Sequence, residues 1–353
     1  MTLHWERQVL LRPEDVPPSR SDWEVIGVFN PGVAVVDGQV MLLVRVAERP
    51  RERRAGYVAL PRWDAAQGFL VDWVSESDVE AIDSRIVRIR STGLVRLTFV
   101  SHLRLARHTP SATVAWVGDV RLEPSAEWEE FGVEDPRITR IGDRYWITYV
   151  AVSRHGAATA LASTVDFRGF ERHGIIFPPE NKDVVLFPEQ IGGHYVALHR
   201  PTTATPFSRP AMWLARSNDL LHWGRHEPLF AGESDWEDER VGAGPPPIRV
   251  VDGWLEIYHG NRRPARPGEV GCYQAAAMLL DADNPTRIRG RSVAPILAPS
   301  EPYEQSGFVP HVVFPTGVTL HDDTLAVYYG AGDTYTAVAK TSLRALIDQL
   351  QRL

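Results

Sequence analysis

The chain has 353 residues and a formal net charge of −7, with 45 Asp and Glu residues against 38 Lys and Arg residues. A mildly acidic chain has no basic excess to neutralise phosphates, so we expect neither a nucleic acid nor a membrane as a partner. The single cysteine, Cys272, excludes an intramolecular disulfide and a cysteine-based metal site.

The N-terminal residues lack the basic and apolar regions of a signal peptide, and the chain contains no apolar run of about 18 residues. We therefore expect a cytoplasmic protein without a transmembrane helix. The 27 glycines, 27 prolines and 11 tryptophans favour a β-rich fold with many turns.

One pattern recurs five times along the chain: a proline, a short run rich in β-branched residues, a tight polar turn and a second β run. The copies begin at Pro31, Pro136, Pro188, Pro247 and Pro315. Turns such as Asp37-Gly38 and Asp252-Gly253, flanked by β-branched and aromatic residues, are a strong hairpin signal. Because proline donates nothing to a ladder, we expect each proline near the start of its strand.

Five such units give about 70 residues per unit, somewhat long for a four-stranded propeller blade. We predict one all-β domain over residues 1–353, a five-bladed β-propeller with extra strands in residues 47–131 and a short C-terminal helix within 340–353. A β-sandwich or two smaller β domains is the alternative. The shared hairpin design and the absence of a linker-like composition favour the propeller.

In a propeller the first strands of the blades surround a central axis, so residues at their entrances converge on one pocket. Glu134 and Asp135 form a carboxylate pair at one entrance, although an aspartate before proline is more often a turn residue. Cations stand at several strand ends, and if they converge they form an anion pocket. They are Arg45, Lys182, Arg200, Arg240 and His259. Each of them alone would be read as a solvated or salt-bridged surface residue.

These segments resemble glycoside hydrolase family 130, the mannoside phosphorylases and β-1,2-mannosidases. The matching segments run in order from residue 29 to residue 337, nearly the whole chain. They include Phe29-Asn30-Pro31, Gly132–Thr139, Val241–Pro245, Ile257–Gly260 and Tyr328–Asp333. The resemblance implies a five-bladed propeller, in agreement with the repeat count.

The resemblance also implies roles for individual residues. Asp135 falls on the catalytic aspartate, the proton donor to the glycosidic oxygen. The substrate-binding positions are Asn30, Arg45, Glu134 and Asp333. The positions that hold inorganic phosphate in the phosphorylases are Lys182, Arg200, Arg240, His259 and Tyr273.

The residues alone are compatible with two reactions, hydrolysis and phosphorolysis. An inverting hydrolase needs a second carboxylate that activates water, whereas an inverting phosphorylase needs only the acid and a cationic site for phosphate. The set of cations favours phosphorolysis to mannose 1-phosphate. Candidate bases for hydrolysis are Glu48, Glu134, Glu189, Glu239 and Glu304.

A propeller that binds sugar without catalysis is a third alternative. We expect an oligosaccharide and inorganic phosphate as ligands, with phosphate as co-substrate, no other cofactor and no metal, because no His/Asp cluster has ligand spacing. Linkage, glycan length and oligomeric state, a homo-oligomer included, are left open by the sequence.

Overall fold

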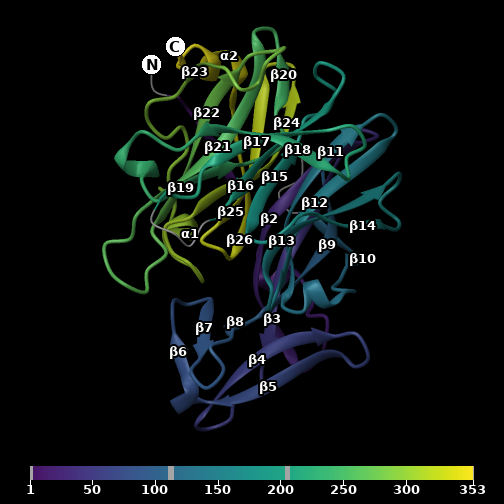
Figure 1. Cartoon of the computed structure of the whole chain (residues 1–353), viewed down its shortest axis with the longest axis vertical. Helices are drawn as coiled ribbons and strands as arrows, with labels where there is room; N and C mark the ends of the chain where they lie inside the picture. Colours follow the sequence, from purple (N-terminus) through teal and green to yellow (C-terminus); the bar gives the residue numbers. More distant parts are fainter. Residues whose placement is uncertain (1–2, 110–114, 203–206, 353) are drawn as a thin grey trace.

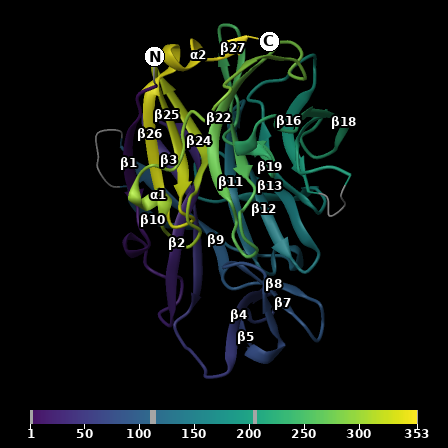
Figure 2. The same cartoon turned by 90° about the vertical axis from the view of Figure 1, so that its left-hand side faces the viewer.

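The computed structural model describes residues 3–109, 115–202 and 207–352. Over these residues the chain is almost entirely β-sheet, with two short α-helices, which confirms the all-β prediction. Four larger sheets form the body of the molecule (Figure 1). A small lobe extends from one end of the body, and both chain termini lie near the other end (Figures 1 and 2).

One four-stranded sheet joins the beginning of the chain to its end. Its order is β1 (Glu6–Leu11), β26 (Tyr335–Ser342), β25 (Thr324–Ala331) and β24 (Val313–His321). All its pairings are antiparallel. The helix α2 (Leu343–Ile347) follows directly, within the stretch where the sequence predicts a helix.

The largest sheet has eight strands but consists of two antiparallel groups. The first group is β2 (Trp23–Val36), β3 (Gln39–Pro50), β9 (Val100–His108) and β10 (Trp116–Leu122). The second is β11 (Gly132–Ile141), β12 (Arg144–Ser153), β13 (Gly156–Thr164) and β14 (Glu171–Phe177). A single parallel pairing, between Gly132 and Ser101, joins them.

Two further sheets complete the body. One consists of β15 (Asn181–Leu186), β16 (Tyr195–Pro201), β17 (Met212–Ser217) and β18 (Trp223–Phe230). The other consists of β19 (Arg240–Ala243), β20 (Ile248–Val250), β21 (Gly253–Arg262), β22 (Cys272–Leu280), β23 (Ile288–Arg291) and β27 (Gln351–Arg352). Buried apolar side chains fill the space between these two sheets, as where Phe187 packs edge to face on Trp254 with ring centroids 5.2 Å apart.

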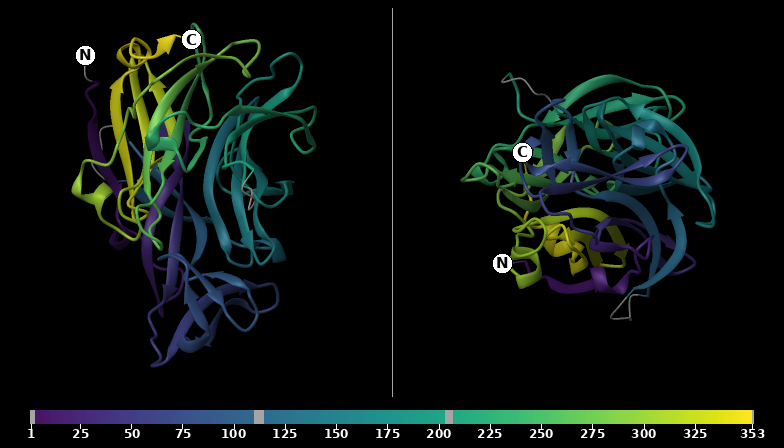
Figure 3. Two further views of the ribbon diagram at one scale, coloured as in Figure 1. Left: turned by 60° about the vertical axis from the view of Figure 1, so that its left-hand side comes forward. Right: turned by 90° about the horizontal axis from the view of Figure 1, so that it is seen from below.

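The lobe is inserted between β3 and β9, in the stretch where the sequence predicts extra strands. It consists of the hairpin β4 (Tyr57–Asp64) and β5 (Gly68–Ser75), and the small sheet β6 (Val79–Ala81), β7 (Ile86–Ile89) and β8 (Val95–Leu97). Seen from below, it lies across the end of the body (Figure 3).

The repeated prolines stand only in part where the sequence analysis expected them: Pro247 and Pro315 lie at or near the start of a strand, and the other three do not. Pro31, Pro136 and Pro315 lie inside β2, β11 and β24, each at a shift in strand register. Pro247 directly precedes β20, whereas Pro188 follows β15. Pro31 and Pro136 are unpaired at their bulges, so a proline there costs no ladder hydrogen bond, whereas Pro315 borders its shift and is paired with Tyr329.

The same bulges orient polar side chains. Asn30, Asp135 and Asp183 lie in the register shifts of β2, β11 and β15, with φ angles of 49°, 47° and 55°. Asn and Asp tolerate this left-handed conformation better than other residues with a side chain. The repeated backbone kink therefore explains why an Asn or Asp recurs at this place.

A buried glutamate is fixed in the same way in three of the antiparallel groups. It lies in a short helical turn before the first strand and accepts a hydrogen bond from a tyrosine on the second strand, at 2.8, 3.0 and 2.6 Å. An arginine from an outer strand lies within 3.7 Å of each carboxylate. The triads are Tyr149–Glu129–Arg172, Tyr258–Glu237–Arg291 and Tyr329–Glu304–Arg7. A buried charge needs such partners, so these glutamates act in the fold.

Candidate active site

A cavity of about 250 Å³ lies between the lobe and the body. Arg85, Ile86 and Leu97 reach it from the lobe, while the other lining residues come from the larger sheets and their loops. Nine of the ten predicted site residues line it. They are Asn30, Arg45, Glu134, Asp135, Lys182, Arg200, Arg240, Tyr273 and Asp333. The convergence expected from strand entrances is therefore present in the structure.

Asp135 is held by one of its two carboxylate oxygens. Asn30 Nδ2 donates to Oδ1 at 2.7 Å, and Arg45 Nη1 donates to the same oxygen at 2.9 Å. Burial by itself would raise the pKa of Asp135, but the charges of Arg45, Arg137 and Lys182 bring it below the usual value. Asp135 is therefore ionised in the unliganded site.

Arg45 fixes the pair of carboxylates as a unit. Its Nη2 donates to Glu134 Oε1 at 2.6 Å, and its Nε donates to Ser101 Oγ at 3.1 Å. The guanidinium also stacks over the ring of Phe29, 4.7 Å from its centroid. A planar fork anchored at every nitrogen has little freedom, so it sets the position of Asp135 rigidly.

The same cavity is lined by three cations, Lys182, Arg200 and Arg240, which together form a cationic wall. Within the described part of the chain Lys182 forms no ion pair, and Nε of Arg240 is buried without a hydrogen-bond partner. Among the described residues Arg200 donates a side-chain hydrogen bond only through its Nε, to Asp183 Oδ2 at 2.7 Å. The terminal nitrogens of Arg200 therefore remain for a ligand in the cavity.

Asp183 is the counter-ion behind this wall. Its Oδ1 lies 3.8 Å from Nη2 of Arg137, a residue completely surrounded by protein. Nη1 of Arg137 donates to the Asp135 carbonyl oxygen at 2.7 Å. Burial opposes ionisation of Asp183, but Arg200 and Arg137 lower its pKa far below the usual value. Asp183 is a permanent anion, so it offsets part of the positive charge.

His259 lies behind the cavity surface. It is fully buried, its Nε2 is 3.4 Å from Asp183 Oδ2, and its ring packs on Phe314 with centroids 4.4 Å apart. Burial lowers the pKa of His259 to about 3, so the ring is neutral near pH 7. The sequence analysis counted it among the cations, and that charge is absent.

Arg85, from the lobe, and Asp333 are two further charged residues that line the cavity. Arg85 is held by Asp83 in two side-chain hydrogen bonds of 2.9 and 3.3 Å. Burial raises the pKa of Asp333, and the charge of Asp135 raises it further, whereas Arg85 and Arg45 lower it. The resulting pKa is about 6. Asp333 therefore changes charge close to neutral pH.

Four of the candidate bases for hydrolysis do not line the cavity. Glu304 belongs to a Tyr–Glu–Arg triad, and Glu48 is buried with Ser19 as its hydrogen-bond donor. Glu239 pairs with Arg240 and Arg263. Glu189 lies in the loop after β15, and only Glu134 faces the cavity, held by Arg45.

The sequence analysis missed several lining residues. Asp183 follows Lys182 at the bulge that corresponds to that of Asp135, so an alignment of the repeats at this position would have found it. Arg85 comes from the inserted lobe, which matches no repeat, and no local signal marks it. Among the described residues no group of three or more His, Cys, Asp or Glu side chains could hold a metal, and no helix is long and apolar enough to cross a membrane.

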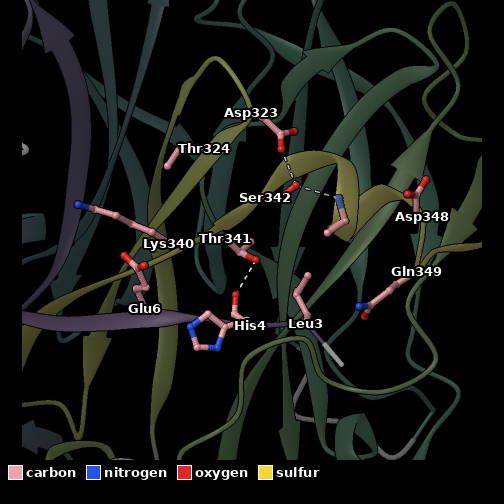
Figure 4. Close-up of a pocket in the computed structure, with 11 residues that line it drawn as sticks. Leu3, His4, Glu6, Asp323, Thr324, Lys340, Thr341, Ser342, Asp348 and Gln349 are labelled. Atoms are coloured by element: carbon pink, nitrogen blue, oxygen red, sulfur yellow. Dashed lines mark hydrogen bonds between the residues drawn. The ribbon is translucent and has the colours of Figure 1, made fainter. Parts of the chain in front are cut away.

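A separate hollow near the chain termini has no comparable chemistry (Figure 4). Its polar groups bond mainly to one another: Ser342 Oγ donates to Asp323 Oδ2 at 2.6 Å, and Thr341 Oγ1 donates to the His4 carbonyl oxygen at 2.8 Å. The bond to His4 fastens the N-terminal segment, and Ser342 Oγ also caps α2 by accepting from Ala345 N at 3.1 Å.

The sequence is similar to known proteins over its whole length. The glycoside hydrolase family 130 model, described as beta-1,4-mannooligosaccharide phosphorylase, matches residues 104–352. Identity to a beta-1,2-mannobiose phosphorylase of Listeria innocua is 38% over 98% of both chains. Identity to a 1,2-beta-oligomannan phosphorylase of Thermoanaerobacter sp. is 38% over 62% of this chain and 71% of that protein.

Solved structures agree with the sequence match. The Listeria innocua enzyme in complex with beta-1,2-mannobiose superposes with a TM-score of 0.90 over 97% of this chain and 96% of that chain. A mannose phosphorylase from Leishmania mexicana, solved with a phosphate ion, is 14% identical with a TM-score of 0.62 over 96% and 88% of the two chains, and shares the fold.

Proposed function

The chain belongs to glycoside hydrolase family 130, and on this premise we propose that it cleaves β-1,2-linked mannosides by phosphorolysis with inversion. The products are α-mannose 1-phosphate and the shortened sugar. The observation that carries the proposal is the placement of Lys182, Arg200 and Arg240 on one cavity with Asp135. Cations with free donors are what a phosphate nucleophile requires.

In the proposed reaction an oxygen of phosphate attacks the anomeric carbon of the terminal mannose. The bond from that carbon to the glycosidic oxygen breaks, and Asp135 supplies the proton to the departing oxygen, directly or through a sugar hydroxyl. Asn30 and Arg45 hold Oδ1 of Asp135, which leaves Oδ2 to carry the proton. Asn30, Arg45, Glu134 and Asp333 then bind the sugar.

The acid must gain a proton before it can act, although Asp135 is ionised in the unliganded site. Phosphate can raise this pKa, since an anion bound against Lys182 offsets one of the charges that lower the pKa of Asp135. Binding of the nucleophile thus prepares the acid. Tyr273 completes the phosphate site, and His259 supports it from behind by its contact with Asp183.

We also propose that the sheets form a single five-bladed domain around the cavity. Five antiparallel groups support this arrangement, counting the two halves of the eight-stranded sheet separately. So do the Tyr–Glu–Arg triads in three of the groups and the pairing of β1 with β26, which would close a ring. The cytoplasmic location stays a prediction from the sequence.

The test is to incubate the protein with β-1,2-mannobiose with and without phosphate, and to follow mannose 1-phosphate by ³¹P NMR. We expect cleavage that needs phosphate, saturates with it, and yields mannose 1-phosphate and mannose in equal amounts. β-1,4-mannobiose, run in parallel, tests the linkage. Equal release of free mannose without phosphate would instead identify an inverting hydrolase, and sugar binding without turnover would identify a binding protein.

A further inference from the structure

A groove of about 720 Å³ lies beside the catalytic cavity. Three pairs of consecutive residues divide the two spaces, with one member lining the groove and the other the cavity. The pairs are Ser84 and Arg85, Cys272 and Tyr273, and His311 and Val312. Three separate segments of the chain therefore lie between the two hollows, and in each segment one residue lines the groove while its neighbour lines the cavity.

Aromatic packing continues across this wall. Phe99 lines the cavity and Phe308 lines the groove, and their rings pack edge to face with centroids 5.5 Å apart. The lobe is attached at the same place, since Ser84 Oγ donates to the Phe308 carbonyl oxygen at 3.3 Å. These contacts hold the groove in a fixed position beside the cavity.

The groove offers both kinds of contact that a sugar ring uses. Phe308, Pro310 and Val270 provide apolar surface, and Arg262 provides hydrogen-bond donors. Its volume is in the range usual for small-molecule sites, about 300–1,000 Å³. Its other side is the loop between β21 and β22, which is pinned where Asn261 Nδ2 donates to the Val270 carbonyl oxygen at 3.1 Å.

We propose that this groove binds the mannosyl units of longer chains, beyond the bond that is cleaved. The inference rests on the proposed function. Asn30, Arg45 and Glu134, the proposed sugar-binding residues, are all buried, so a mannosyl unit held by them is enclosed by protein. The remainder of a longer substrate must therefore leave over the rim, where the groove continues the site.

The experiment compares β-1,2-mannobiose with β-1,2-mannotetraose on a variant whose groove is filled. Ala265 is exposed and lines the groove, so Ala265→Trp adds bulk without disturbing the core. Arg266→Trp is the matched control, because Arg266 is an exposed neighbour that does not line the groove. Arg262→Ala removes donors without adding bulk.

We expect Ala265→Trp to raise the KM for the tetraose about tenfold, the effect of losing about 1.4 kcal/mol of binding. Arg262→Ala should raise it less, and Arg266→Trp should have no effect. The KM for mannobiose should stay within about twofold in all three variants. An unchanged tetraose KM in Ala265→Trp, or an equal rise for both substrates, would overturn the proposal.

Binding measured calorimetrically without phosphate separates this proposal from the proposed function. If the wild type cleaves no mannoside, phosphorolysis fails. The groove is still tested, because Ala265→Trp should weaken binding of the tetraose and leave that of mannobiose unchanged. Equal binding of the tetraose to both proteins would again refute the groove.

Discussion

Asp183 accepts a hydrogen bond from Nε of Arg200 at 2.7 Å, and this bond orients the terminal nitrogens of Arg200 toward the cavity. The carboxylate is only 3% exposed, whereas the cations around it meet at the site of the proposed phosphate. Asp183 is thus a permanent anion of the protein beside Arg200, where the proposed phosphate would bring a second negative charge.

Asp183→Asn should destabilise the protein, because it leaves Arg200 and Arg137 buried without their counter-ion. Removing one partner of a buried ion pair costs about 3–5 kcal/mol. Added phosphate should restore more stability to this variant than to the wild type, as measured by thermal unfolding. Chloride at equal ionic strength is the control, and identical stability of the two proteins in low salt would contradict the role of Asp183.

Arg200→Ala should raise the KM for phosphate at least about tenfold and change the KM for mannobiose by less than about twofold, because it removes a contact to the nucleophile alone. Arg200→Lys keeps the charge but loses the fork, so it should remain impaired. Steady-state kinetics with each substrate varied in turn give both constants. A variant in which both constants rise equally would place Arg200 outside a phosphate site.

Asp135→Asn should lower kcat at least about a hundredfold, the low end for loss of general-acid catalysis. Sugar binding should persist, since the amide oxygen still accepts the hydrogen bonds of Asn30 and Arg45. Turnover and calorimetric titration with mannobiose measure the two effects separately. Retained turnover would remove Asp135 from the reaction.

Phosphate binding should be linked to protonation of Asp135, whose pKa Lys182 helps to hold low until the anion arrives. At pH 7 the wild type should take up more protons per phosphate than Asp135→Asn. Calorimetry in two buffers of different ionisation enthalpy measures this difference. Asp333, with a pKa of about 6, can also take up protons near pH 7, so the comparison is repeated in the Asp333→Asn background. Equal uptake with and without Asp135 in that background would contradict the linkage.

Asp333→Asn should stabilise the protein at neutral pH while impairing activity. The pKa of Asp333 is raised to about 6, so the folded state binds the proton more tightly than the unfolded state. The sign follows: the wild type loses stability as the pH rises from about 4 to about 6, by about 3 kcal/mol at most. Urea unfolding at pH 4 and pH 7.5 should show a gain for the variant only at the higher pH, and a gain independent of pH would contradict this account.

The sequence by itself determined the all-β class, the repeated hairpins and the convergence of polar strand entrances. Hairpin turns and the alternation of side chains are local, so Asp37-Gly38 or Asp252-Gly253 reveal them within a few residues. Asp135 and the cations of the cavity stand at strand ends of the repeat, but their roles were named from the resemblance to the family, because the pattern alone favoured a turn residue and surface charges.

Only the tertiary structure decided which charges act and which are neutralised. Burial makes His259 neutral, and a tyrosine and an arginine from distant strands bind Glu304 within the fold. Arg85 enters the cavity from an inserted lobe that no repeat predicts. The ionisation of a side chain depends on its burial and on charges within a few ångströms, and neighbours distant in the sequence provide both.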